Sequence, residues 1–291
     1  MNLYGLLIAK DEADIIEQTL LSLREFGGFK KIFFYDNGSS DETANIAKKF
    51  NDIIPKVYTL TDAFSDHLKY QLLNSHADEY KLGDWLAIID ADELYAENAL
   101  DKISIAENSQ ANYIESKSAQ FYFTDREDCH TFLPNIPAIA QRPHYLINYG
   151  EPRLFKFIPD QTLSEHTVKS RSTLLKLSPD KLLLNHFQYR SALQTQHRID
   201  VRIANNNTSN NWGHIKDKHW QDYLVKADYL HRYDKQPIFG LPQNANLYKT
   251  PNNPAYTSAS LKWMATNGYL TEQQQEFFKA GRVERLLRKI L

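Results

Sequence analysis

Three carboxylates lie within four residues at the point where an apolar run ends. The stretch "LAIIDADELY" covers residues 86–95, and its apolar part leads into Asp90, Asp92 and Glu93. Side chains at alternate positions after a strand can point the same way once the chain leaves the pleat. Carboxylate oxygens arranged in this way hold Mg²⁺ or Mn²⁺, whose remaining positions water and phosphate oxygens fill. A divalent ion would also offset the repulsion among the clustered negative charges.

The elements that must position these carboxylates follow an α/β pattern. Four segments have the composition of strands, and they cover residues 3–9, 30–36, 55–60 and 84–90. The first is a continuous apolar run, the pattern of a strand buried on both faces. The segments between them carry apolar residues at helical spacing, and they cover residues 11–27, 42–50 and 64–80. Strands that alternate with helices indicate right-handed crossovers and a mostly parallel sheet.

Polar clusters follow the first, second and fourth apolar runs: "KDE", "DNGSSD" and "DADE". Parallel sheets bind ligands at the carboxyl ends of their strands, so the three clusters share one binding edge. Each cluster alone has an ordinary explanation, because acidic residues after a strand often cap a helix, as we expect for Asp41. Three clusters on one edge favour a site.

The bulk composition excludes some partners. The chain has 291 residues, 42% of them hydrophobic, and a net charge of -2, so no global field recruits nucleic acid. Its single cysteine, Cys129, cannot form an intramolecular disulfide, which fits a reducing compartment. The first apolar run is too short for a signal peptide, and no stretch reaches the length that spans a bilayer. We therefore expect a cytoplasmic protein.

The pattern changes in the second part of the chain. Four strand-like segments without regular intervening helices are "ANYIESKSAQFYF", "AIAQRPHYLI", "EPRLFKF" and "KLLLNHFQY". Helical patterns follow at roughly 190–206, 217–233, 257–266 and 271–291. We predict a first domain over 1–188, with halves 1–110 and 111–188, and a helical C-terminal region over 189–291.

Several motifs together carry a resemblance. The stretches "AKDEADIIEQTLLSL", "FFYDNGSSDET" and "GDWLAIIDADEL", in this order, resemble the nucleotide-sugar half of family 2 glycosyltransferases, above all the bacterial subgroup with an Asp-x-Asp-Glu motif. Glycosyltransferases of family 92 have a similar layout. The resemblance covers about residues 3–95 and continues more weakly through "EPRLFKF" and "NHFQYRSALQTQHRIDVR". It implies a GT-A fold, a Rossmann-like, mostly parallel sheet flanked by helices, with a helical C-terminal extension.

The resemblance also implies which residues bind the nucleotide. Asp36 would hydrogen-bond the base, usually uracil, and Lys10 and Glu12 would line the nucleotide pocket. Asp90 would contact the ribose, or the metal ion through water. Asp11 departs from the pattern, because the subgroup usually has Asn there.

The implied metal ligands are Asp92, with Glu93 supporting the metal shell, and His186. GT-A enzymes commonly supply a late histidine to the ion that the diphosphate binds, and His186 follows an apolar run in "LLLNHFQYRS". An imidazole among carboxylates suits Mn²⁺ better than Mg²⁺. The alternative for His186 is a histidine that is merely hydrogen-bonded at a strand end.

Transfer with inversion needs a carboxylate that deprotonates the acceptor hydroxyl. The candidates are Glu165, which we prefer, then Glu151, and Asp160. An exposed loop position is the alternative for each of them. Arg153 could hold a phosphate or an acceptor, or form an ordinary surface salt bridge. Lys69 and Gln71 lie on the helix before the metal strand. Gln71 matches a position that is often Gln in the subgroup, and a solvated helix face is its alternative.

The last residues, 279–291, form one amphipathic pattern. Five basic residues and one acidic residue give this segment a local charge of +4, opposite an apolar stripe of Val283, Leu286, Leu287, Ile290 and Leu291. A helix packed on its own domain, a dimer contact, or a helix that touches the anionic inner face of the cytoplasmic membrane would each explain the stripe.

From these patterns we predict a metal-dependent, inverting glycosyltransferase with a UDP-sugar donor. The resemblance implies a hydroxyl of a bacterial surface glycan, such as lipopolysaccharide or capsule, or a lipid-linked glycan, as acceptor. One alternative is a sugar nucleotidyltransferase, which would normally carry a Gly-rich loop with Arg or Lys after the first strand, unlike "AKDEAD". Another is a non-catalytic nucleotide- or glycan-binding protein. The oligomeric state stays open.

Overall fold

The structure is a computed structural model that describes residues 1–61, 65–159, 162–164, 175–209, 218–235, 237–243, 245, 247 and 254–279. The chain forms two compact units, Met1–Ser118 with Gly150–His186, and Ala119–Tyr149 with Phe187–Leu291. Two long strands, β6 (Tyr113–Tyr122) and β7 (His144–Lys156), each run from one unit into the other. The division at residue 188 stays a prediction.

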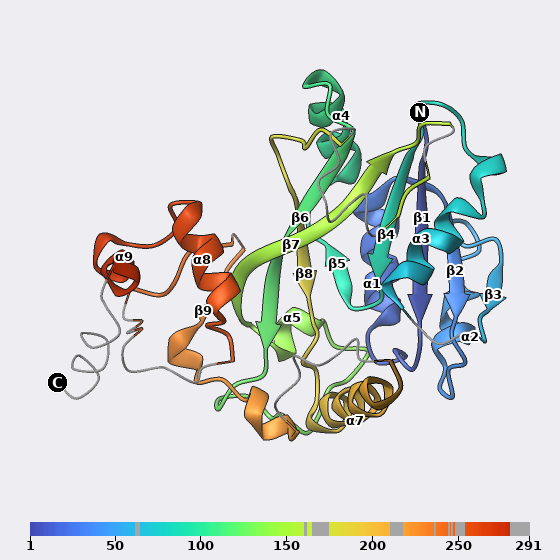
Figure 1. Cartoon of the computed structure of the whole chain (residues 1–291). Helices are drawn as coiled ribbons and strands as arrows, with labels where there is room; N and C mark the ends of the chain where they lie inside the picture. Colours follow the sequence, from blue (N-terminus) through green and yellow to red (C-terminus); the bar gives the residue numbers. More distant parts are fainter. Residues whose placement is uncertain are drawn as a thin grey trace. The chain divides into compact units, whose positions relative to one another are not determined.

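The first unit contains the parallel part of the sheet (Figure 1). Its strands are β1 (Leu3–Ala9), β2 (Phe29–Asp36), β3 (Val57–Thr59) and β4 (Trp85–Asp90), in the spatial order β3-β2-β1-β4. The chain adds β2 and β3 on one side of β1 and then returns to place β4 on the other side. The strand order therefore reverses between β1 and β4, where open α/β sheets form their binding crevice.

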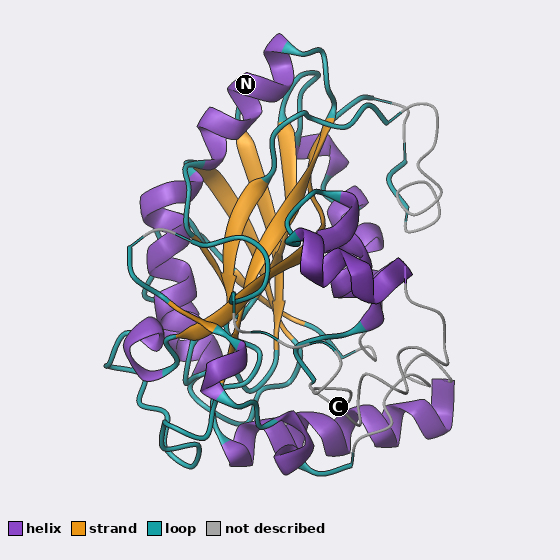
Figure 2. Cartoon of the chain, turned by 90° about the vertical axis from the view of Figure 1, so that its left-hand side faces the viewer, coloured by secondary structure: helices purple, strands orange, loops and turns teal. Residues whose placement is uncertain are grey.

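Helices cover both faces of these strands, which Figure 2 shows as purple elements on either side of the orange sheet. Side chains alternate between the faces along a strand. Leu3 and Leu7 belong to a core that includes α1 (Ile16–Ser22), α2 (Thr43–Ala47) and α4 (Ala99–Asn108). Tyr4 and Leu6 belong to a second core with α3 (Asp66–Asn74). A strand buried on both faces has an uninterrupted apolar sequence, and this explains the pattern of residues 3–9.

The rest of the sheet is mixed. It continues from β4 in the order β7-β6-β8-β5, where β5 is Glu93–Tyr95 and β8 is Leu182–His186. Strand β7 is antiparallel to β4, and β5 is antiparallel to β8. The predicted α/β class, with a sheet flanked by helices and helices near the C-terminus, is confirmed.

Strand β7 replaces the two strands expected at 138–147 and 151–157. The polar stretch "NYGE" does not break it, because Gly150 lets the backbone approach closely: an added Cβ would lie 2.5 Å from the carbonyl oxygen of Ser116. Residues 138–141 are not a strand but the short helix α5 (Ala138–Gln141), which begins after Pro137.

The second unit has its own apolar core, which includes Tyr122, Leu146, Val225 and residues of α8 (Ser258–Thr266). The predicted helices at 190–206 and 257–266 are present as α7 (Ala192–Ser209) and α8. The helix expected at 217–233 is wrong. This segment forms two 3-10 turns, η3 (Trp220–Tyr223) and η4 (Ala227–Tyr229), and strand β9 (His231–Arg232). Its backbone pairs with neighbouring strands: Tyr233 N donates to Pro143 O at 2.8 Å.

The last described helix is α9 (Glu272–Lys279), and the amphipathic segment beyond it lies outside the described residues. The three alternatives for residues 279–291 therefore stay open. In the part of the chain that the structure describes, none of the helices combines the length and the apolar character that crossing a bilayer requires.

Candidate active site

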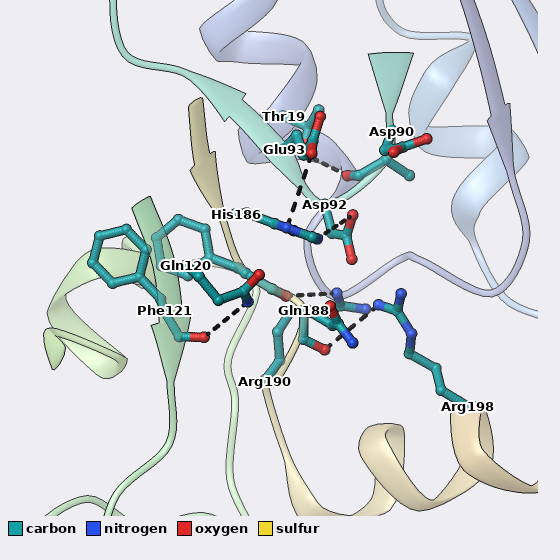
Figure 3. A network of polar contacts seen from close by, with 12 residues as sticks. Thr19, Asp90, Asp92, Glu93, Gln120, Phe121, His186, Gln188, Arg190 and Arg198 are labelled. Carbon is teal, nitrogen blue, oxygen red and sulfur yellow. Dashed lines mark hydrogen bonds and ion pairs between the residues drawn. The ribbon is translucent and has the colours of Figure 1, made fainter. Parts of the chain in front are cut away.

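Helix α1 anchors the turn that carries the acidic residues. Thr19 Oγ1 donates to Ala91 O at 2.6 Å, and Tyr95 N donates to Ser22 Oγ at 3.0 Å. Both helical side chains are buried. Figure 3 shows Thr19 beside Glu93 at the start of β5. Because these two bonds hold the segment 91–95 at both of its ends, Asp92 and Glu93 have fixed starting points for their side chains.

Strand pairing brings His186 to these acids. His186 is the partner of Glu93 in the antiparallel pair of β5 and β8. Its Nε2 lies 3.4 Å from Asp92 Oδ1, and its Nδ1 lies 3.9 Å from Glu93 Oε1 (Figure 3). Asp92 and Glu93 are each 4% exposed. The structure therefore brings the predicted ligands Asp92 and His186 together from segments that are 94 residues apart (186 − 92).

Two cations neutralise the other acidic positions. Arg153 on β7 donates from Nη2 to Asp90 Oδ2 at 2.6 Å and to Glu93 Oε1 at 2.7 Å. Lys69 on α3 donates to Asp90 Oδ1 at 2.7 Å. Arg153 is 3% exposed, so the expectation of a surface salt bridge is wrong. The Lys69 side chain is only 12% exposed, whereas Gln71 on the same helix is exposed, which agrees with the solvated alternative for Gln71.

Charge and burial act in opposite directions on this cluster. Burial raises the pKa of Asp90, but the charges of Arg153 and Lys69 outweigh it and hold the pKa well below its ordinary value. Burial also raises the pKa of Glu93 above its ordinary value, although Arg153 opposes the shift. Burial lowers the pKa of Arg153, yet Asp90 and Glu93 keep it well above its ordinary value. Arg153 and Asp90 are therefore charged at neutral pH.

Asp92 and His186 fit a divalent ion. One carboxylate oxygen and one imidazole nitrogen, each about 2.0–2.2 Å from an ion, can lie up to roughly 4 Å apart. Their 3.4 Å separation falls within that limit. Among the described residues, no group of three or more His, Cys, Asp or Glu side chains is arranged to hold a metal. Two protein ligands leave positions for phosphate oxygens and water, which Mg²⁺ and Mn²⁺ sites commonly use.

The predicted nucleotide-binding residues lie along the same edge. In the sheet register, Ala9 on β1 pairs with Asp36 on β2, and Ile8 pairs with Asp90 on β4. Asp36 and Asp90 thus end the two strands that flank β1, on the order of 10 Å apart at two strand spacings. Ser39 N donates to the Asp36 carboxylate at 3.4 Å.

The loops after β1 and β2 are joined by side chains. Lys10 is exposed and Glu12 is half-buried on the first loop, where Glu12 N donates to Thr43 Oγ1 at 2.8 Å. Asp41 accepts from Thr43 N at 2.9 Å and from Ala13 N at 3.0 Å. The N-cap position of α2 is Glu42, so Asp41 lies one residue before the expected place and also links the two loops.

The candidate bases are less well placed. Glu151 is on β7 with its side chain 69% exposed, and its Oε2 lies 3.6 Å from Arg153 Nη1. Glu165 and Asp160 lie outside the described residues. The identity of the base stays a prediction.

A comparison with family models assigns the domain that holds most of this edge. Residues 6–104 match the model described as Glycosyl transferase family 2. These residues form a glycosyltransferase family 2 domain. Lys10, Glu12, Asp36, Asp90 and Asp92 all lie within it. This domain confirms the predicted class of enzyme, a glycosyltransferase. The nucleotidyltransferase alternative would have required a match to a nucleotidyltransferase family.

Solved structures of glycosyltransferases show weaker likeness. TarS of S. aureus (residues 1–349, with UDP) is 12% identical, with 77% of this chain and 70% of that chain covered and a TM-score of 0.37. A longer TarS structure is 13% identical, with 74% of this chain and 41% of that chain covered and a TM-score of 0.38. The mannosyltransferase PcManGT from Pyrobaculum calidifontis, with GDP-Man and Mn²⁺, is 15% identical, with 99% and 87% covered and a TM-score of 0.40. No curated protein sequence matches the chain.

Sequence reasoning missed Thr19 and Ser22, and it named Lys69 and Arg153 without finding their partners. Thr19 and Ser22 are polar residues among the apolar positions of a helix, which is a usable signal for a buried anchoring role. Lys69 and Arg153 gave no comparable signal, because a charged residue in an isolated segment does not reveal its partner.

Proposed function

We propose that the chain transfers a sugar from a UDP-sugar to an acceptor hydroxyl, with inversion, and that a divalent cation held by Asp92 and His186 takes part. One observation carries the proposal. A carboxylate oxygen and an imidazole nitrogen lie 3.4 Å apart at the binding edge of a glycosyltransferase family 2 domain. Such a pair suits Mn²⁺, with Mg²⁺ as the second choice. When bound, the ion would offset the charge of the diphosphate leaving group.

The nucleotide would lie along the edge between β2 and β4. Asp36 would accept a hydrogen bond from the uracil ring, Asp90 would contact the ribose, and Lys10 and Glu12 would line the pocket. Their positions at the carboxyl ends of neighbouring strands support this arrangement. Lys69 and Arg153 already hold the Asp90 carboxylate in one orientation, which lowers the entropy lost when it contacts a ligand.

The reaction we propose is a single displacement. The acceptor oxygen forms a bond to the anomeric carbon while the bond from that carbon to the diphosphate oxygen breaks, and UDP leaves with the electron pair. The acceptor proton passes to a carboxylate of the chain, for which Glu165 is the first candidate and Glu151 the second. Glu151 has the exposure that an acceptor-facing base requires.

The acceptor is proposed from the resemblance to the bacterial subgroup: a hydroxyl of a surface glycan such as lipopolysaccharide or capsule, or of its lipid-linked form. The proposed location is the cytoplasm. The basic amphipathic residues 279–291 support a peripheral contact with the inner face of the cytoplasmic membrane.

Calorimetry with UDP, with and without Mn²⁺, tests the metal site. We expect Mn²⁺ to raise the affinity for UDP at least about tenfold, which corresponds to about 1.4 kcal/mol. Asp92→Asn should abolish this increase and leave the metal-independent affinity in place. Asp101→Asn, an exposed carboxylate of the same domain, is the control and should behave as the wild type. Equal UDP affinity with and without Mn²⁺ in the wild type would contradict the proposal. Stronger binding of GDP than of UDP would indicate a GDP-sugar donor.

Turnover separates an enzyme from a binding protein. Slow release of UDP from a panel of UDP-sugars in Mn²⁺ should identify the donor, because glycosyltransferases commonly hydrolyse their donor without an acceptor. Glu165→Gln should keep UDP affinity and lose UDP release. Unchanged release in Glu165→Gln together with loss in Glu151→Gln would assign the base to Glu151.

A further inference from the structure

Arg153 is buried among the acidic residues of the candidate site. A single nitrogen, Nη2, donates to Asp90 at 2.6 Å and to Glu93 at 2.7 Å, and the residue is 3% exposed. Strand β7 pairs Leu154 with Ala87, so Arg153 lies one residue nearer the carboxyl edge of β4. A side chain with so little exposure can influence a ligand only through the groups that it holds.

Glu93 is the group through which Arg153 reaches the proposed metal site. Its Oε1 accepts from Arg153 Nη2 and faces His186 Nδ1 at 3.9 Å. At 3.9 Å this contact is an ion-pair contact longer than a hydrogen bond. A carboxylate on the far side of a histidine ring favours the orientation that places an N–H towards it and offers the other nitrogen to a metal. With Nδ1 towards Glu93, the nitrogen that faces Asp92 is Nε2.

The Glu93 carboxylate depends on Arg153 for its position. Within the described residues, Arg153 is its one hydrogen-bond donor, and Glu93 Oε2 is buried without a hydrogen-bond partner. A buried carboxylate without that donor would rotate or take up a proton, because desolvating its charge costs several kcal/mol. The His186 ring would then lose the negative charge that Glu93 places beside its Nδ1.

We propose that Arg153 is a positioning residue: together with Glu93 it forms a buried pair that orients His186 so that Nε2 points to the cation site beside Asp92. The inference rests on the proposed function, because it concerns the same cation. It assigns Arg153 neither to a phosphate nor to an acceptor.

The test must separate positioning from folding. Arg153→Met alone leaves two buried carboxylates without their cation and is expected to destabilise the protein. Arg153→Met/Glu93→Met removes the pair together, and replacement of a buried ion pair by apolar residues of similar volume is often neutral. The matched control is Lys156→Met/Glu107→Gln, which removes an ion pair of 2.7 Å from the same strand at the opposite edge of the sheet. The amide oxygen that replaces the Glu107 carboxylate can still accept from Trp85 Nε1.

The readout is the Mn²⁺-dependent increase in UDP affinity, measured by calorimetry together with the melting temperature. We expect the Arg153/Glu93 double variant to remain folded. Its Mn²⁺-dependent increase in UDP affinity should be smaller than that of the wild type by a factor of about 10–100, the usual effect of removing an outer partner of a metal ligand. The Lys156/Glu107 control should keep the full increase. UDP affinity without metal should not change in the Lys156/Glu107 control. In the Arg153/Glu93 double variant Asp90 keeps only Lys69 as its cation, so the metal-independent affinity is measured separately and the readout is the ratio of the affinities with and without Mn²⁺.

A mutant cycle that combines His186→Asn with the Arg153/Glu93 double variant decides whether Arg153 and Glu93 act through the His186 imidazole. If they do, adding His186→Asn to the Arg153/Glu93 double variant costs little more, because the losses are not additive. Additive losses, or a folded double variant with the full Mn²⁺ effect, would overturn the positioning role and leave the proposed function intact. A wild type without any Mn²⁺ effect would overturn both.

Discussion

Asp11 and Ser40 join the loops that follow β1 and β2. The Asp11 carboxylate oxygen Oδ1 accepts from Ser40 N at 2.7 Å and from Ser40 Oγ at 3.0 Å. The backbone of Asp11 has φ 53°, in the left-handed region that Asn and Asp tolerate better than other non-glycine residues. An Asn side chain could offer its amide oxygen to the same two donors. This explains why Asp can stand where the glycosyltransferase subgroup usually has Asn.

Asp11→Asn should therefore be tolerated, whereas Asp11→Ala should not. Alanine loses both hydrogen bonds and fits the left-handed conformation poorly, so we expect it to lower the free energy of unfolding by about 1–3 kcal/mol. Denaturant unfolding of both variants measures the difference. Equal loss in the two variants would show that the carboxylate charge, and not the backbone and hydrogen-bond geometry, matters at this position.

The ion pair of Lys69 with Asp90 should contribute more to stability than a surface pair. Lys69→Met removes a charge-assisted hydrogen bond of 2.7 Å from a mostly buried side chain, which is worth about 1.5–3 kcal/mol. Lys31→Met removes a more exposed pair with Glu79 and should cost about 0–1 kcal/mol. Urea unfolding compares the two, and similar losses would contradict the buried role of Lys69.

His76 should make the protein less stable in mild acid. Its ring stacks on the Phe33 ring with 3.7 Å between the ring centroids, and Tyr35 OH lies 2.8 Å from its Nε2. Burial lowers the pKa of His76, and the charge of Lys31 also lowers it, against the opposing charge of Glu79. As the pH falls through about 6.5, the unfolded state takes up a proton first, so stability present above that pH is lost below it.

Melting temperatures at about pH 7.5 and about pH 5 test this dependence. His76→Gln keeps an acceptor for Tyr35 but cannot titrate, so it should lose less stability between the two conditions than the wild type. An equal loss in variant and wild type would assign the acid sensitivity to other groups.

Two glycines with positive φ should respond differently to alanine. Gly28 has φ 66°, and an added Cβ would lie 2.6 Å from Leu100 Cδ1, whereas Gly83 has φ 89° and nothing within 4 Å. Both substitutions strain the backbone, but only Gly28→Ala also overpacks the contact with Leu100. We expect Gly28→Ala to cost about 1–3 kcal/mol more than Gly83→Ala in chemical unfolding. A cost in Gly83→Ala as large as in Gly28→Ala would show that backbone strain alone decides.

The buried parallel strands could be read from the sequence, because burial on both faces requires an unbroken apolar run. Residues 3–9 match β1 in full, and residues 84–90 differ from β4 by one residue. The prediction for 217–233 is wrong because its apolar residues have helical spacing, whereas Val225 N and Tyr233 N donate to Phe123 O and Pro143 O, which are distant in sequence. The spacing of apolar residues within one segment does not reveal hydrogen bonds to residues that are distant in sequence.

The site shows the same limit. The placement of Asp36, Asp90 and Asp92 on one edge could be predicted because they follow strand-like runs, and a parallel sheet gathers strand ends on one edge. The pairing of His186 with Glu93 required the register of β5 with β8, and β5 is only three residues long. The partners of Arg153 depend on β7 running antiparallel beside β4, which no feature of "EPRLFKF" indicates.

The shared strands β6 and β7 limit how this protein can be recombined with others. The chain leaves the first unit after Ser118, returns to it at Gly150 and leaves it again after His186. A chimera with one crossover point must therefore split at least one unit between two parents. Exchange of the first unit as a whole needs three junctions, and two of them lie inside β-strands, where the hydrogen-bond ladder must continue.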